Sequence, residues 1–156
     1  MAIDLRSLDE PLSLPPRISL ERVSDVESLQ IWLRVMSQGS SMPEKVLDPL
    51  SEVARNYHFE SEADVVCYLG RFDGRPVATS MLYLDAGVAG LYNVATLPEA
   101  RRQGFGTALT LAPLLDARAR GYRIGILQSS PMGLNIYRRL GFREYCVFHG
   151  YFWQGQ

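Results

Sequence analysis

The sequence predicts an α+β protein built on a mixed, largely antiparallel sheet with flanking helices. Residues 65–96 are rich in β-branched and aromatic residues and contain the turn signals Asp73-Gly74 and Asp85-Ala86-Gly87, which is typical of a meander of strands. After residue 96, helical stretches alternate with short apolar runs, as in strand–helix–strand units. The 156 residues suffice for one domain with its own core.

The first 64 residues are predicted to form a lead-in, one strand and two helices. Ile18 and Leu20 alternate with polar residues, whereas the apolar residues from Val26 to Met36 recur at helical spacing behind the cap residue Asp25. We expect an irregular lead-in (1–16) before a single domain (17–156), and in that domain first a strand (17–23), a helix (25–39), a second helix (43–57) and an acidic loop (60–64).

The rest of the chain is predicted to alternate between strands and helices. Gly121 suits the end of a long helix, and Pro113 inside that helix should bend it. The expected elements are strands at 65–72, 76–84 and 88–96, a helix at 104–120, a strand at 124–128, a helix at 131–140, and an aromatic-rich strand or hairpin at 142–153.

Composition and charge exclude several classes of function. No apolar run approaches the ~20 residues that span a bilayer, and the acidic start is unlike a secretory signal, so we expect a cytoplasmic protein without membrane contact. Cys67 and Cys146 lie in apolar runs without ligand spacing and are predicted to be buried free thiols. Neither they nor the two histidines indicate a metal site.

The charge is distributed unevenly along the chain. Residues 91–156 carry eight arginines against three acids, whereas residues 1–90 carry eight bases against fourteen acids. A basic half suits a polyanionic ligand and an acidic half a cationic one, although solvated helix faces would give the same pattern. Nucleic-acid binding is not expected, because aromatic residues are not interleaved with the basic ones.

The strongest chemical signal is the segment Asn93-Val-Ala-Thr-Leu-Pro-Glu-Ala-Arg-Arg-Gln-Gly-Phe-Gly106. A strand ends near Thr96, two glycines follow, and a helix begins, so that unpaired N–H groups and the helix dipole could hold a pyrophosphate. Arg101 and Arg102 add positive charge. A lone Gly-x-Gly is better explained as an ordinary strand-to-helix loop that needs glycines for its φ angles, and neither a Walker loop nor a three-glycine dinucleotide motif is present.

Two motifs together resemble the GNAT acetyltransferase superfamily. Arg101-x-x-Gly104-x-Gly106 resembles its Arg/Gln-x-x-Gly-x-Gly/Ala signature, and Tyr137-Arg-Arg-Leu-Gly-Phe142 resembles its Tyr-x-x-x-Gly-Phe motif. The resemblance is sharp over residues 88–144 and only architectural over residues 17–87. It implies acetyl-CoA as co-substrate, no metal, and a sheet whose strands splay apart at the coenzyme cleft.

The resemblance also implies which residues bind the coenzyme. Backbone groups of the first splayed strand would pair with the pantetheine arm, with the N–H near Val94 as oxyanion contact. Many relatives carry Asn at the pantetheine contact that is Ser130 here. The implied coenzyme-binding residues are Val94, Ala95, Thr96, Arg102, Gln103, Gly104, Phe105, Gly106, Thr107 and Ser130.

The implied reaction is direct attack of an amine on the thioester, with Tyr137 as general acid for the leaving thiolate. Without its motif, Tyr137 would be better explained as a core aromatic. No base is assigned, because the Glu of related N-terminal protein acetylases is Gly125 here; a water chain or a carboxylate of the acidic half stays open. The acceptor would be a small-molecule or peptide amine. A non-catalytic coenzyme sensor is the alternative.

The chain end differs from that of most relatives, which finish with a hairpin after Gly-Phe. Only fourteen residues follow Phe142. We therefore expect an open apolar edge around Val147–Trp153 and a possible homodimer that closes it.

Overall fold

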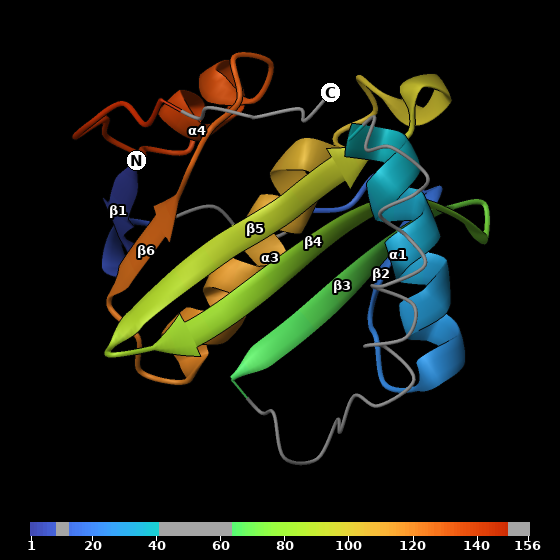
Figure 1. Cartoon of the computed structure of the whole chain (residues 1–156), viewed down its shortest axis with the longest axis horizontal. Helices are drawn as coiled ribbons and strands as arrows, with labels where there is room; N and C mark the ends of the chain where they lie inside the picture. The colour runs from blue at the N-terminus through green and yellow to red at the C-terminus, as the bar shows by residue number, and fades with distance from the viewer. Residues whose placement is uncertain (9–12, 41–63, 150–156) are drawn as a thin grey trace, which may run out of the picture.

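The computed structural model describes residues 1–8, 13–40 and 64–149, which form a six-stranded sheet in the order β1-β6-β5-β4-β3-β2 with helices against its faces (Figure 1). The strands are β1 (Ala2–Asp4), β2 (Ile18–Arg22), β3 (Val65–Phe72), β4 (Arg75–Asp85), β5 (Val88–Thr96) and β6 (Ile124–Leu127). The helices are η1 (Leu5–Ser7), α1 (Val26–Ser40), η3 (Pro98–Ala100), α3 (Phe105–Ala119) and α4 (Leu134–Arg139).

The predicted fold class is confirmed. Strands β2 to β5 form an antiparallel meander, and β5 pairs with β6 in parallel after the crossover through α3. The turns at Asp73 and Ala86 adopt left-handed backbone conformations, each followed by a glycine with positive φ, as the hairpin signals require. The strands predicted at 65–72 and 88–96 have the expected bounds, and α3 continues through Pro113.

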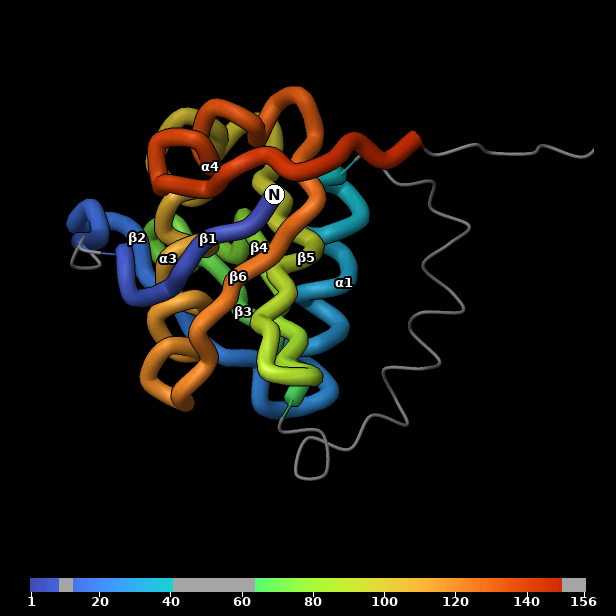
Figure 2. The backbone as a smooth tube through the Cα atoms, turned by 90° about the vertical axis from the view of Figure 1, so that its left-hand side faces the viewer, coloured from blue at the N-terminus to red at the C-terminus, as the bar shows by residue number. Residues whose placement is uncertain are grey.

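Helices α1 and α3 cover opposite faces of the sheet, which lies between them in Figure 2. Helix α1 begins behind Asp25, whose carboxylate accepts the Ser28 N–H at 2.7 Å. The buried Trp32 indole N–H donates to the carbonyls of Tyr68 and Ser80, each at 3.1 Å, and so fixes α1 on β3 and β4. On the opposite face, α3 inserts the fully buried Leu109 and Leu114 into the main core.

The expectation that residues 1–16 are irregular is wrong at the start of the chain. Ala2–Asp4 forms β1, which pairs antiparallel with β6 and is joined on its other side to Arg143 by backbone hydrogen bonds of 2.9 Å in both directions. The strand is held because Ile3 and Leu5 are buried, at 5% and 0% exposure. The free energy gained by burying two aliphatic side chains outweighs the conformational entropy lost when a short terminal segment becomes ordered.

The strand or hairpin predicted at 142–153 is not present over residues 142–149, and residues 150–153 lie outside the described part. Phe142 is buried, but Tyr145, Val147 and Phe148 are 72%, 78% and 74% exposed. The physical reason is that β1 already occupies the sheet position beside β6. Cys67 is buried as predicted, whereas Cys146 in this segment is exposed, which corrects the second thiol prediction.

Two further predictions concern the helices. Helix α4 is shorter than the predicted 131–140, because residues 131–133 form a turn before it. The second helix predicted at 43–57 and most of the acidic loop at 60–64 lie outside the described residues. None of the helices in the described residues has the length and apolar character required to cross a membrane.

Candidate active site

A cleft opens where β5 and β6 separate. Their parallel pairing covers only residues 88–91 of β5 and 124–127 of β6, although β5 continues to Thr96. The separation starts at a β-bulge in which Asn93, with φ of 51°, and Val94 lie opposite the single residue Ser80. The Thr79 hydroxyl donates to the Asn93 carbonyl at 2.9 Å and stabilises this bulge. A bulge bends and twists its strand, so β5 turns away from β6.

The alternation of hydrogen bonding along β5 exposes backbone groups in the cleft. The Leu97 N–H donates to the Val77 carbonyl at 2.9 Å, so the pair formed by Thr96 and Ala78 is one whose backbone groups point away from each other. Ala95 therefore exchanges hydrogen bonds with β4. The Thr96 N–H points toward the open side, and the Thr96 carbonyl accepts from Arg101 Nε at 3.2 Å. An extended ligand could pair with these groups as an added strand.

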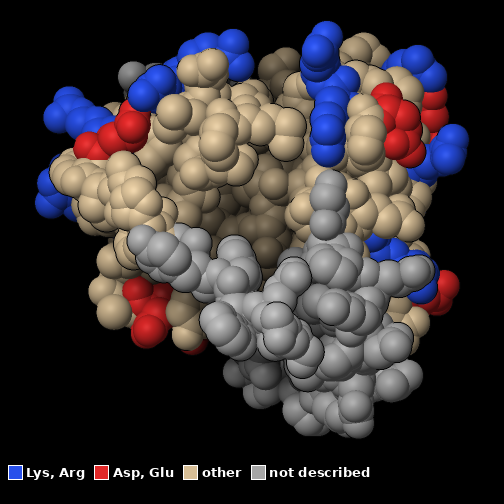
Figure 3. Space-filling model, turned by 45° about the horizontal axis from the view of Figure 1, so that its top comes forward, with Lys and Arg blue, Asp and Glu red and all other residues tan. Residues whose placement is uncertain are grey.

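A cavity of about 1050 Å³ fills the space between the separated strands. Figure 3 looks onto this end of the molecule and shows a hollow with largely uncharged walls and basic side chains at its rim. The cavity is lined by residues of β5, of the loop before α3 and the first turn of that helix, of α4 and the segment before it, and of the last turn of α1: Gly39, Ser40, Val94, Ala95, Thr96, Ala100, Arg101, Arg102, Gly104, Phe105, Gly106, Thr107, Ser130, Met132, Gly133, Ile136, Tyr137 and Arg139.

One end of the cavity is formed by the start of α3. Gly104 is the N-cap residue, with φ of 96° and no side-chain cap, so the N–H groups of Phe105, Gly106 and Thr107 have no intrahelical partner. Gly106 packs against α4, because a β-carbon there would lie 2.8 Å from Ile136 Cδ1. Unpaired N–H groups and the positive end of the helix dipole make this end a site for an anion.

The neighbouring arginines have different surroundings. Arg102, in the loop before α3, and Arg139, in α4, line the cavity and are exposed. The guanidinium of Arg101 instead donates to backbone carbonyls, that of Thr96 at 3.2 Å and that of Gly39 at 3.4 Å. Positive charge toward an anion therefore comes from Arg102 and Arg139.

Tyr137 contributes a buried phenol to the cavity lining, with 7% of its surface exposed. Its ring packs edge to face on Phe142 with centroids 5.8 Å apart, and a β-carbon at Gly133 would lie 2.8 Å from the ring. Burial raises the pKa of Tyr137 above its ordinary value, and the Thr110 hydroxyl opposes part of this shift. The phenol is therefore protonated at neutral pH and able to donate a hydrogen.

Comparison with protein families identifies the fold around this cleft. The family described as the acetyltransferase (GNAT) domain matches residues 63–144, more than half of the chain. The chain belongs to the GNAT acetyltransferases. No curated protein matches its sequence.

Solved structures of GNAT proteins share this architecture. A GCN5-related N-acetyltransferase from Kribbella flavida is 25% identical, with a TM-score of 0.66; the match covers 91% of this chain but only 52% of that one, so this chain spans about half of its length. A predicted acetyltransferase from Clostridium acetobutylicum, solved with acetyl-CoA, is 15% identical over 86% of this chain and 95% of that one, with a TM-score of 0.70. An aminoglycoside acetyltransferase from an uncultured soil metagenomic sample is 17% identical over 88% and 99%, with a TM-score of 0.72.

The GNAT cleft gathers almost all residues that the motifs predicted. Of the eleven, only Gln103 does not line the cavity. The sequence reasoning missed Gly39 and Ser40 at the end of α1, and also Met132 and Arg139. Met132 and Arg139 stand within a few positions of Tyr137 and could have been found from their place around that motif. The end of α1 carries no motif.

The GNAT cleft offers no carboxylate among its described lining residues. At Gly125, where related N-terminal protein acetylases carry Glu, a β-carbon would lie 2.9 Å from Leu5 Cδ2 and 3.1 Å from Leu114 Cδ2. A glutamate at this position would therefore point into the apolar core. Within the described ranges, no cluster of His, Cys, Asp and Glu has the arrangement of a metal site.

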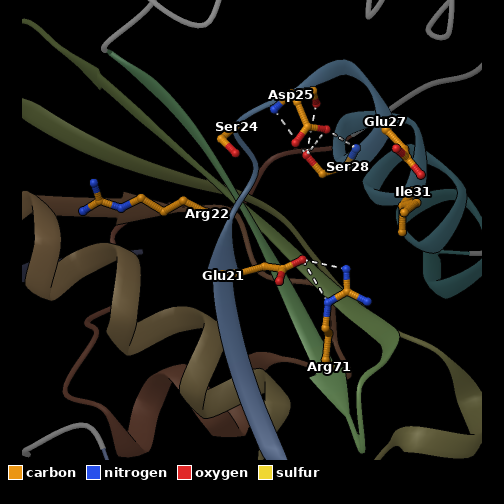
Figure 4. A pocket seen from close by; sticks show the side chains of 8 residues that line it. All are labelled: Glu21, Arg22, Ser24, Asp25, Glu27, Ser28, Ile31 and Arg71. Atoms are coloured by element: carbon orange, nitrogen blue, oxygen red, sulfur yellow. Dashed lines mark hydrogen bonds and ion pairs between the residues drawn. The ribbon is translucent and has the colours of Figure 1, made fainter.

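A second, smaller hollow of about 280 Å³ lies where β2 meets α1 (Figure 4). Most of its charged groups have partners: Arg71 contacts Glu21 at 2.7 Å, Arg22 pairs with Asp116, and Asp25 caps α1 through Ser28. The hydrogen bond from the Ser28 N–H holds the pKa of Asp25 below its ordinary value. These contacts explain the charged residues of the hollow as the cap and ion pairs at the start of α1. The candidate active site is therefore the GNAT cleft.

Proposed function

We propose that this GNAT domain transfers the acetyl group of acetyl-CoA to a primary amine by direct attack, without a covalent acyl-enzyme. The observation that carries the proposal is that a single cavity joins the outward backbone groups of β5, the unpaired N–H groups of α3 and the Tyr137 phenol. This combination suits a long ligand with an amide-containing arm, a pyrophosphate and a thioester.

Backbone groups do most of the proposed coenzyme binding. The Thr96 N–H and the backbone of Val94 would pair with the pantetheine amides, while the Thr96 carbonyl stays bonded to Arg101, and the N–H groups at the start of α3 would hold the pyrophosphate. Arg102 and Arg139 add positive charge. Ser130 also lines the cavity, but its hydroxyl already accepts the Gly133 N–H at 3.4 Å, which leaves it less available than the longer Asn of relatives.

The chemistry assigns one role each to Val94 and Tyr137. The amine nitrogen bonds to the thioester carbon, and the Val94 N–H stabilises the oxyanion. When the carbon–sulfur bond breaks, Tyr137 donates its proton to the departing sulfur and recovers one from solvent. The amine proton leaves through water, because the described walls carry no carboxylate that could accept it.

A thiol-release assay with a panel of amines tests the proposal. Small amines, polyamines, aminoglycosides, amino acids and peptide N-termini would each be added with acetyl-CoA, and steady release of free CoA thiol is expected with at least one class. The lack of a described carboxylate favours a second candidate, a coenzyme-binding sensor without turnover. Saturable acetyl-CoA binding without thiol release across the whole panel would support the sensor.

A further inference from the structure

Arg101 joins two walls of the GNAT cleft. Its Nε donates to the Thr96 carbonyl at the end of β5, and its Nη2 donates to the Gly39 carbonyl in the last turn of α1. The two carbonyls belong to elements far apart in the sequence, and the planar guanidinium presents its donors in a fixed fork that can bridge them. Both bonds are partly buried, so solvent competes with them only in part.

The contact with Arg101 stabilises the C-terminal end of α1. The last carbonyls of a helix lack intrahelical partners and carry partial negative charge. The last turn of α1 contains no basic residue. The Ser40 hydroxyl donates to the Met36 carbonyl at 2.6 Å, and Arg101 supplies a donor to the Gly39 carbonyl from another element.

The last turn of α1 also packs directly against the end of β5 that lines the cleft. A β-carbon at Gly39 would lie 3.1 Å from both Ala95 Cβ and the Thr96 nitrogen, so only glycine allows this approach without displacement. That Thr96 nitrogen faces the cleft. If the end of α1 shifts, it therefore pushes on β5, the strand that would pair with the pantetheine arm.

We propose that Arg101 is a positioning residue that couples occupancy of the coenzyme cleft to the last turn of α1. The Arg101 side chain is hydrogen-bonded to the Thr96 carbonyl, and the Arg101 backbone belongs to the loop that would hold the pyrophosphate. If bound coenzyme reduces the motion of Thr96 and of this loop, the bonds of Arg101 reduce the motion of the end of α1 as well. The end of α1 lines the cavity through Gly39 and Ser40. This inference rests on the proposed binding of acetyl-CoA.

Hydrogen-exchange mass spectrometry with and without CoA tests the coupling and needs no acceptor. In the wild-type protein, CoA should slow amide exchange in two places, the loop at 97–107 and the last turn of α1. In Arg101→Ala, the slowing in the loop should persist and the slowing in α1 should be lost, with little change in the CoA dissociation constant. Arg75→Ala is the control: it removes an exposed arginine of β4 that does not line the cleft, so both effects should remain.

Arg101→Gln provides the same test if the alanine variant is unfolded, because a shorter amide cannot bridge both carbonyls. Slowing of α1 that persists undiminished in the Arg101 variants would overturn the coupling, as would a wild-type protein in which CoA protects the loop but never α1. A folded wild-type protein that shows no protection anywhere and no measurable CoA affinity would instead overturn the proposed function.

Discussion

Replacing Tyr137 by phenylalanine removes one hydroxyl from the centre of the proposed mechanism and leaves the fold nearly unchanged. The ring would keep its edge-to-face packing on Phe142, and Thr110 would keep its own hydrogen bond to the Gly106 carbonyl at 2.7 Å, so no buried donor loses its partner. General-acid catalysis contributes about 10²–10⁴-fold, or about 3–5 kcal/mol of transition-state stabilisation. We expect kcat to fall by that factor with KM for acetyl-CoA nearly constant.

The assay is steady-state release of CoA thiol at saturating acetyl-CoA, with Tyr83→Phe, a substitution on an exposed tyrosine of β4, as the matched control. Because burial raises the pKa of Tyr137, any alkaline limb that reports its ionisation should lie above pH ~10 and be absent from the variant. Full activity in Tyr137→Phe, or an equal loss in Tyr83→Phe, would refute the assignment of the acid.

Other predictions concern the loop, the thiols and the chain end. Gly104→Ala and Gly121→Ala should each destabilise the fold by about 1–2 kcal/mol in denaturant titrations, because both glycines have positive φ, but only Gly104→Ala should weaken acetyl-CoA binding; equal binding losses would contradict backbone recognition. A thiol reagent should modify the exposed Cys146 at once and Cys67 only on unfolding, and two fast thiols would be the wrong result. Since burial raises the pKa of Cys67 to about 12, the unfolded thiol loses its proton first, and stability should decrease as pH rises above about 9; a flat profile between pH 9 and 12 would contradict this. Phe148→Glu should convert a dimer into a monomer in sedimentation at tens of micromolar, and a wild-type monomer would contradict the predicted pairing.

The central part of the fold could be predicted because its signals are local. The turn residues at Asp73 and Asp85 fix the hairpins, and the β-branched and aromatic residues beside them favour strands, so β3 and β5 have the expected bounds. The motif spacing likewise placed Gly104 and Tyr137 in one cavity.

The two ends of the chain could not be predicted because their structure depends on competition for one position. Residues 142–149 are rich in aromatic residues, as strands often are, yet the place beside β6 is held by β1, whose three residues are too few to show a period. The contact between Arg101 and Gly39 depends on two segments sixty-two positions apart, and no local pattern records it. Long-range pairing of this kind is decided by tertiary packing rather than by propensity.

Isothermal titration of the folded protein with acetyl-CoA tests the central claim most directly, because every proposed role depends on the thioester lying in the cleft between β5 and β6. We predict saturable binding of one acetyl-CoA per chain, accompanied by a rise in melting temperature that grows with ligand concentration. A protein that is folded by circular dichroism but shows neither binding heat nor a melting shift at millimolar acetyl-CoA would contradict the account.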